Sequence, residues 1–459
     1  MAKLVEDAER LNSEGRIADA EVMLREAVER DPGNESLVQA WCNAMLAVGD
    51  VRDGVALLEQ AIAAGVRDPS VRFCMALAHQ TDGQFKQACA ILKELLVEYP
   101  QLTQATHVMV RMLLLERKHQ DAMEILEPQL GSGDPLIACA FGLVAAAVDR
   151  RDEAVHLLAG VLDEERVAAA IRGEAGLILA RLLDELERYD EAMRSAERAN
   201  RLAAVPYDPK ASVAEAEGLI AEYTAARVAA LPRATGDTSR PIFILGMPRS
   251  GTSLVEKMVG EHRAVGALGE CRFVESLMPM DLSDEDSVQQ FSARLLALYG
   301  ELDDTNRHVT DKQLGNHGHL AAIRSLLPES RVIWCRRDVR DVCVSCFFQQ
   351  FQLGTPWSHD LQHIADYHRI YDRLMEHWEQ VLEGPILRVE YEKLVTETRP
   401  QVERMLAYLG LEWDPQCLKF DQSEQLTLTV SSEQVRRSVY RSSVGRWRNY
   451  AAHLADLRI

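Results

Sequence analysis

The sequence predicts an N-terminal α-helical solenoid followed by an α/β domain with a parallel sheet, and two observations support this fold class. Small residues recur every 34 residues in the first half, which is the length of a helix–turn–helix repeat. In the second half a run of apolar β-formers, Ile242–Leu245, leads through a glycine-bounded loop into a helix. We expect the solenoid over residues 1–205, a connecting helix and linker over 206–240, and the α/β domain over 241–459.

The repeat is visible in glycines near the helix–helix contact, in small residues that keep the same step, and in prolines that we expect to close the second helix of successive units. These three sets are Gly15, Gly49 and Gly83; Ala20, Gly54, Ala88 and Ala122; and Pro32, Pro69 and Pro100. Later copies keep the start of a second helix at Asp152–Ala154 and Tyr189–Ala192. The pattern resembles the tetratricopeptide (TPR) repeat and predicts about six helix pairs. The groove of such a solenoid commonly holds a peptide or another protein, but a structural arm is an alternative.

Residues 211–231 are expected to form one more helix, ended by Pro232. A polar segment then runs to Pro241, where the second domain begins.

The composition restricts the partners and the compartment. A formal charge of −20 argues against nucleic-acid binding, which depends on neutralising phosphates. We expect no signal peptide and no integral membrane segment, because the start lacks a basic and apolar leader and no apolar run approaches ~20 residues. Nine scattered cysteines indicate reduced thiols in the cytoplasm. We interpret Cys343 and Cys346 as one helix face rather than as a metal or redox site.

The loop that begins at Gly246 reads G-x-x-x-x-G-T-S, which is the spacing of a Walker A phosphate loop. Thr252 stands where that motif has its lysine. The loop is therefore P-loop-like but lacks the group that reaches the β- and γ-phosphates of a nucleoside triphosphate. Its amides, with Arg249, Ser250, Thr252 and Ser253, suit a shorter anionic group.

Polar residues follow several predicted strands or lie on the next helix. Glu270 and Arg272 come shortly after the loop, and the pair Asp311–Lys312 follows Val309 at the end of a short predicted strand. We expect further strands at 332–335 and 386–389, followed by the polar residues Arg336, Arg337, Ser345 and Tyr391. Ligands bind at the carboxyl ends of parallel strands, so we expect Arg336 and Arg337 at the binding edge of the sheet, and Arg337 and Ser345 can both grip a phosphate. Five arginines between 436 and 448 suit a phosphate clamp.

These motifs resemble those of the bacterial TPR-repeat sulfotransferases and, more distantly, the tyrosylprotein sulfotransferases. The shared motifs appear in the family's order over roughly residues 206–450. They are P-R-S-G-T-S-L at 248–254, G-E-x-R at 269–272, D-K at 311–312, R-D-x-x-x-x-x-x-S at 337–345, and the segment from Ser431 to Trp447.

The resemblance implies transfer of a sulfuryl group from 3′-phosphoadenosine 5′-phosphosulfate (PAPS) to an acceptor hydroxyl, which releases 3′,5′-bisphosphoadenosine without a metal. The acceptor would be a protein tyrosine, a sugar or a small molecule, and the TPR groove would bind a protein partner. Glu270 would be the general base and Lys312 the cation at the bridging oxygen, with Ser432 as a third catalytic residue. Arg272 would contact the acceptor. The residues assigned to the cofactor are Arg249, Ser250, Gly251, Thr252 and Ser253 at the 5′-phosphosulfate, Arg337, Ser345 and Arg437 at the 3′-phosphate, and Tyr391.

Two departures, two alternative bases and two competing functions accompany this interpretation. Gln349 stands where the tyrosylprotein enzymes have another cofactor arginine, and Arg437 replaces their lysine. His262 and His317 are alternative bases. A kinase with a degenerate loop and a non-catalytic TPR scaffold are the competing functions.

Overall fold

The computed structural model describes residues 2–13, 16–48, 54–81, 84–351, 355–420 and 443–459 of the 459-residue chain. The chain divides into two compact units, Met1–Leu182 and Leu183–Ile459. The division lies within helix α11 (Ala169–Glu185), before the boundary at residue 205 that the repeat pattern predicts. The following helix, α12 (Tyr189–Ala203), therefore belongs to the second unit.

Six consecutive helix pairs occupy the part of the chain up to residue 203 that the structure describes, in agreement with the predicted number of repeats. The pairs are α1 (Ala2–Ser13) with α2 (Ile17–Arg30), α3 (Glu35–Val48) with α4 (Val55–Ala63), α5 (Pro69–Thr81) with α6 (Phe85–Glu98), α7 (Thr103–Leu115) with α8 (His119–Leu126), α9 (Pro135–Val144) with α10 (Arg151–Asp163), and α11 with α12. A 3-10 turn, η2 (Glu127–Ser132), follows α8.

Small residues lie at the helix contacts, as the 34-residue step predicts. The side chains of Ala20, Ala88 and Ala122 are completely buried. At Gly54 an added Cβ would lie 2.6 Å from Met45 Sδ, so a larger residue would force that side chain to move. The glycines of the other recurring set, Gly15, Gly49 and Gly83, lie outside the described residues.

The prediction that Pro69 closes a helix is wrong. Helix α4 ends at Ala63, and Gly65 turns the chain with a φ of +103°, which favours glycine. Pro69 is instead the first residue of α5, a position where its missing N–H costs no helical hydrogen bond.

The segment expected as one helix over 211–231 is two helices, α13 (Pro209–Glu222) and α14 (Ala225–Ala229). Thr224 lies between them in an extended conformation, and its Oγ1 accepts a hydrogen bond from Arg227 N at 3.3 Å. A capping hydroxyl thus starts a new helix where the apolar pattern suggested continuity.

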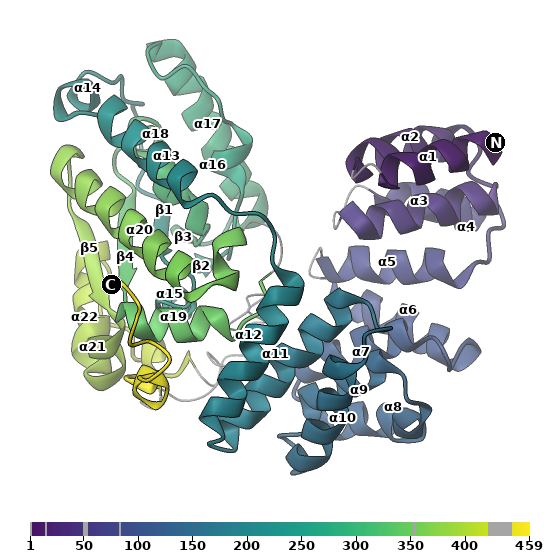
Figure 1. Cartoon of the computed structure of the whole chain (residues 1–459). Coiled ribbons are helices and arrows are strands. Elements are labelled where there is room, and N and C mark those ends of the chain that lie inside the picture. Colours follow the sequence, from purple (N-terminus) through teal and green to yellow (C-terminus); the bar gives the residue numbers. More distant parts are fainter. Residues whose placement is uncertain (1, 14–15, 49–53, 82–83, 352–354, 421–442) are drawn as a thin grey trace. The chain divides into compact units, whose positions relative to one another are not determined.

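The second unit contains a five-stranded sheet in which all pairings are parallel, as predicted. The strands are β1 (Pro241–Gly246), β2 (Val265–Ala267), β3 (His308–Asp311), β4 (Arg331–Arg336) and β5 (Ile386–Glu390), in the spatial order β2-β3-β1-β4-β5 (Figure 1). Strand β1 is central and buried along its whole length. The segments that follow β1, β3 and β4 therefore meet at one edge.

Helices cover this sheet. They are α15 (Thr252–Gly260), α16 (Phe273–Ser276), α17 (Glu285–Leu302), α18 (Leu320–Leu326), α19 (Val339–Phe347), α20 (Leu361–Val381), α21 (Tyr391–Thr396) and α22 (Thr398–Leu409), with the 3-10 turns η3 (Leu314–His319), η4 (Pro356–His359), η5 (Pro415–Leu418) and η8 (Arg446–Tyr450). One apolar core joins β1, β4 and β5 to α15, α21 and α22. None of the described helices combines the length and apolarity needed to cross a bilayer.

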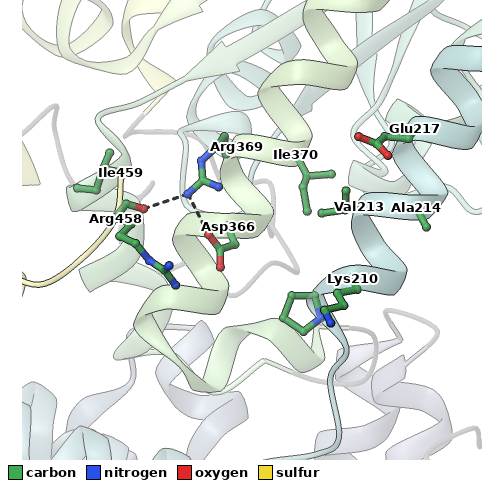
Figure 2. Close-up of a pocket in the computed structure, with 10 residues that line it drawn as sticks. Lys210, Val213, Ala214, Glu217, Asp366, Arg369, Ile370, Arg458 and Ile459 are labelled. Atoms are coloured by element: carbon green, nitrogen blue, oxygen red, sulfur yellow. Dashed lines mark hydrogen bonds and ion pairs between the residues drawn. The ribbon is translucent and has the colours of Figure 1, made fainter.

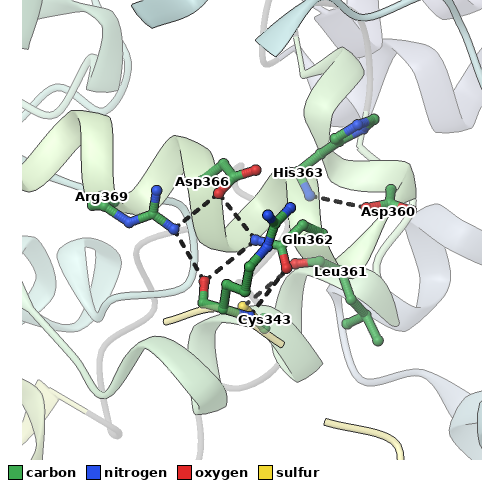
Figure 3. Close-up of polar contacts among 8 residues, drawn as sticks. Cys343, Asp360, Leu361, Gln362, His363, Asp366 and Arg369 are labelled. Carbon is green, nitrogen blue, oxygen red and sulfur yellow. Dashed lines mark hydrogen bonds and ion pairs between the residues drawn. The ribbon is translucent and has the colours of Figure 1, made fainter. Parts of the chain in front are cut away.

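The start of α20 is anchored by polar contacts (Figure 3). The Asp360 carboxylate caps it by accepting from His363 N at 2.9 Å, and Gln362 Nε2 donates to Asp366 Oδ1 at 3.0 Å. The Cys343 thiol on α19 points to the Leu361 carbonyl, 3.9 Å away. Cys343 and Cys346 are free, buried thiols on α19, which agrees with a packing role.

Candidate active site

The loop between β1 and α15 has the geometry of an anion cradle. Gly251 is the N-cap of α15, with a φ of +102°, so the first amides of the helix follow directly after the loop. Arg249 is a non-glycine residue with a φ of +68°, a strained conformation that is concentrated at ligand sites. The buried Ser250 hydroxyl has no hydrogen-bond partner among the described residues. This donor is therefore available for an anion.

Three predicted cofactor residues from distant segments meet beside this loop. Arg249 Nε donates to Ser345 Oγ on α19 at 2.9 Å, and Arg337 Nη1 donates to the Arg249 carbonyl at 2.9 Å. Arg337 Nε is buried without a hydrogen-bond acceptor in the described part of the chain. We call Arg249, Arg337, Ser345 and Tyr391 the arginine cluster.

Tyr391 completes the cluster from the start of α21. The Arg337 guanidinium lies over its ring at 4.5 Å from the centroid. Gly251 packs against the same ring, so closely that a Cβ added to Gly251 would lie 2.7 Å from Tyr391 Cδ2. Both the space and the positive φ therefore require glycine at position 251.

The two predicted catalytic residues are in direct contact. Lys312 Nζ donates to Glu270 Oε1 at 2.7 Å. The Lys312 side chain is 1% exposed and that of Glu270 is 49% exposed, so only the carboxylate reaches solvent. Lys312 follows β3 and Glu270 follows β2, which places the pair at the carboxyl edge of the sheet.

A second carboxylate, Glu256 on α15, contacts the segments that lead into Glu270 and Lys312. Its Oε1 accepts from Gly269 N at 3.0 Å and from Thr310 Oγ1 at 2.8 Å. Burial raises the pKa of Glu256, while the positive charge of Lys312 and the two hydrogen bonds oppose that rise.

Asp311, next to Lys312, is also buried. Tyr299 Oη donates to Asp311 Oδ2 at 2.6 Å, and Gln313 N donates to Oδ1 at 2.9 Å. Burial raises the pKa of Asp311 to about 6, against the effect of these hydrogen bonds. Asp311 therefore connects α17, which carries Tyr299, to β3, and Lys312 directly follows that strand.

The described residues 443–459, here called the C-terminal strap, contact the arginine cluster. Arg337 Nη2 donates to the Ser443 carbonyl at 2.5 Å. The Asp341 carboxylate on α19 accepts from Gly445 N at 2.7 Å and from Trp447 N at 2.9 Å. The backbone of the strap is thus fixed beside Arg337.

The strap also contacts the end of α11. Arg446 Nη2 lies 2.9 Å from Asp184 Oδ2, and Tyr450 Oη donates to Asp184 Oδ1 at 2.5 Å. Desolvation opposes the charge of Arg446, but the pKa of its guanidinium is raised because Asp184 outweighs that effect.

Other predicted residues are placed differently or not described. Arg272 is 71% exposed and pairs with Glu275 at 2.9 Å. His262 uses both ring nitrogens in contacts with Glu412 O and Ala264 N. His317 is stacked on Tyr371, and burial lowers its pKa to about 4. Ser432 and Arg437 lie outside the described residues.

A cavity of about 660 Å³ lies elsewhere in this unit, between α13, α20 and the end of the strap (Figure 2). Its apolar lining includes Val213 and Ile370. Arg369 on its wall donates to Asp366 at 2.9 Å and to the Arg458 carbonyl at 3.0 Å. It contains none of the predicted site residues.

Sequence reasoning did not single out Glu256 or Tyr299 and gave Asp311 no role of its own. No local signal identifies Glu256, because the apolar positions Leu254, Val255, Met258 and Val259 recur at helical spacing and leave position 256 on the expected polar face.

Two family models match the chain. Residues 241–415 match the sulfotransferase family, and residues 11–78 match a tetratricopeptide repeat. The resemblance predicted from the motifs is thereby confirmed for these two regions.

Three known proteins illustrate the similarity. An uncharacterised protein of Aquifex aeolicus (strain VF5) is 30% identical over 330 residues, which cover 67% of this chain and 43% of that protein. A putative protein-tyrosine sulfotransferase of Caenorhabditis briggsae is 24% identical over 45% of this chain and 80% of its own length. The sulfotransferase domain of the Synechococcus PCC 7002 olefin synthase is 18% identical over 48% of this chain and 90% of that domain, with a TM-score of 0.38. This chain thus spans less than half of the Aquifex protein.

Proposed function

We propose that the second unit transfers a sulfuryl group from PAPS to an acceptor hydroxyl. The observation that carries the proposal is the position of Lys312. The cation comes from the end of β3 rather than from the loop, and it contacts Glu270, the residue proposed as base, at 2.7 Å. The lysine-free loop fits a phosphosulfate, which is shorter than a triphosphate.

The residues present fit the two charged ends of PAPS. Ser250, with its open hydroxyl, and the first amides of α15 would hold the 5′-phosphosulfate. The arginine cluster would hold the 3′-phosphate, with Arg337 and Ser345 as its direct contacts. Because Arg249 already donates to Ser345, we assign its guanidinium to the 3′-phosphate end as well. Arg437 remains a proposed contact to the same phosphate.

The proposed reaction needs one bond to form and one to break. The acceptor oxygen attacks sulfur, and its proton passes to the Glu270 carboxylate. The bond between sulfur and the bridging oxygen breaks, and bisphosphoadenosine leaves with that electron pair. Lys312 stabilises the negative charge on the leaving oxygen. Ser432 remains a proposed third catalytic residue, and the exposed Arg272 remains a proposed acceptor contact.

A thermal-shift comparison tests the donor. Bisphosphoadenosine is expected to raise Tm of the full chain in a concentration-dependent way, whereas ATP with Mg²⁺ has little effect. The reverse result would favour a kinase with a degenerate loop and contradict the proposal.

We further propose that the repeats bind a protein or peptide that is, or carries, the acceptor. The TPR-model match at residues 11–78 supports a binding role, and the nine free cysteines fit a reducing compartment such as the cytoplasm. The test should use the full chain, because a truncation at residue 207 would remove α12, whose Asn200 donates to the Phe347 carbonyl at 2.8 Å. Cross-links from a sulfated acceptor are expected within residues 17–182. Cross-links confined to the second unit would contradict recruitment by the repeats.

A further inference from the structure

The transfer pair, Glu270 and Lys312, depends on a turn and a strand end that must stay in register. Lys312 N donates to the Gly269 carbonyl at 2.8 Å, and Leu268 N donates to Thr310 Oγ1 at 3.3 Å. These contacts join the segment before Glu270 to the segment before Lys312.

Glu256 contacts both of these segments through one carboxylate oxygen. The helix that carries it begins at the anion loop, and its carboxylate accepts from Gly269 N and from Thr310 Oγ1. Gly269 thus has its N–H bound by Glu256 and its carbonyl bound by Lys312 N. One oxygen of Glu256 therefore links the loop helix, the turn and the strand.

The two carboxylates near Lys312 differ in exposure. Glu256 is 3% exposed as a residue, whereas the Glu270 side chain is 49% exposed. Only Glu270 can meet an acceptor that arrives from solvent. Because Glu256 is buried, we assign it no contact with the acceptor or the donor, and its role would be exerted through the groups that it holds.

We propose that Glu256 is a positioning residue, whose buried carboxylate holds the Gly269–Glu270 turn against β3 and so sets the geometry of the Glu270–Lys312 pair. This inference rests on the proposed function, since the pair is assigned to sulfuryl transfer. A buried carboxylate is costly compared with an apolar side chain. Here it supplies the acceptor for two donors, the part-buried Gly269 N–H and the buried Thr310 hydroxyl.

Two variants separate the hydrogen bonds from the charge. Glu256→Gln keeps an oxygen that can accept from both donors, and Glu256→Met has a similar length but no strong acceptor. For Glu256→Met we expect kcat to fall roughly 10- to 100-fold, because small displacements of reacting groups have effects of this size. The Kd for bisphosphoadenosine should stay within about threefold of the wild-type value, since the cofactor contacts are made elsewhere. Glu256→Gln should keep most of kcat.

Ser292→Ala is the matched control for a loss of stability alone. Ser292 is buried, and its hydroxyl donates to the Leu326 carbonyl at 2.6 Å, away from the pair. An equal fall in kcat in Ser292→Ala, or an unchanged kcat in Glu256→Met, would overturn the proposal. If Glu256→Met does not fold, Glu256→Asp replaces it. Its shorter side chain should lower kcat at least about tenfold at unchanged Kd, and a wild-type kcat would again overturn the proposal.

Hydrogen exchange of the peptide 268–271 measures the same contact without activity. Exchange is expected to be faster in Glu256→Met than in the wild type and Glu256→Gln, and equal exchange in all three would contradict the positioning role. If the wild type shows this protection but transfers no sulfate from PAPS, the proposed function fails while the positioning contact stands.

Discussion

The two ends of the candidate site are built on different principles. The arginine cluster joins three segments, and with the neighbouring phosphate loop it leaves two buried polar atoms without a partner among the described residues, namely Ser250 Oγ and Arg337 Nε. In the transfer pair, by contrast, Lys312 already donates a hydrogen bond to Glu270. The residue before Glu270, Gly269, is held by a hydrogen bond to the buried Glu256. One end is therefore ready to take an anion, whereas the other must exchange an internal contact for the reacting atoms.

The largest effects are expected at the transfer pair. Lys312→Ala removes the cation that stabilises the leaving oxygen, so kcat should fall about 10²- to 10³-fold, as for the loss of an oxyanion-stabilising donor. The Kd for bisphosphoadenosine should change little, because this residue acts on charge that develops in the transition state. Steady-state kinetics and titration calorimetry on the same preparation provide both values.

Arg337→Ala should show the opposite balance. Loss of a charged hydrogen bond of about 1.5–3 kcal/mol predicts a Kd for bisphosphoadenosine that rises about 10- to 100-fold. The wild-type affinity should weaken with added salt, and this salt dependence should be smaller in the variant. Similar losses of affinity in Arg337→Ala and Lys312→Ala would contradict the division of roles between the two ends.

A smaller effect is expected where the strap meets α11. Asp184→Asn removes the charge that holds Arg446 and should lower the free energy of unfolding by about 2 kcal/mol, with a weaker nucleotide affinity because the strap contacts Arg337. Asp190→Asn is the control, since its contact with His453 is made by a carboxylate that is 75% exposed. Denaturant titrations that gave equal changes for both variants would refute a structural role of the strap.

The last prediction concerns the pH dependence of stability. Burial raises the pKa of Asp311 to about 6 from an ordinary value of 3.8, so the folded state holds this proton more tightly than the unfolded state. The contribution of Asp311 to the free energy of unfolding is fully present below pH 4 and is lost as the pH rises through 6. This loss amounts to about 3 kcal/mol. The difference in unfolding free energy between the wild type and Asp311→Asn should therefore change over this window. A difference that is independent of pH would contradict the buried titration.

The sequence predicted the elements whose signals are local. The parallel strands around Ile242–Leu245 and Val332–Cys335 are continuous apolar runs, and the 34-residue step predicted six helix pairs. The break at Thr224 and the start of α5 at Pro69 were missed, because capping and the first helical position depend on one residue and not on periodicity.

The candidate site was predictable where a motif lies in one segment. Contacts that join distant segments were not predictable, since sequence spacing carries no information on them. Glu256 to Gly269, Tyr299 to Asp311, and Asp184 to Arg446 are examples. These contacts arise from the order of the strands and from the packing of α15, α17 and the strap. The assignments of Glu270, Lys312 and the arginine cluster stay predictions until activity is measured.

The most direct test of the account is transfer of radiolabelled sulfate from PAPS by the purified full chain, with host lysate as the source of acceptor. We expect a labelled product and an equal amount of bisphosphoadenosine from the wild type, and a rate about 10²- to 10³-fold lower from Lys312→Ala at unchanged bisphosphoadenosine affinity. No label transfer by a wild type that binds bisphosphoadenosine would favour a non-catalytic scaffold, and an equal rate in Lys312→Ala would contradict the assigned transfer pair.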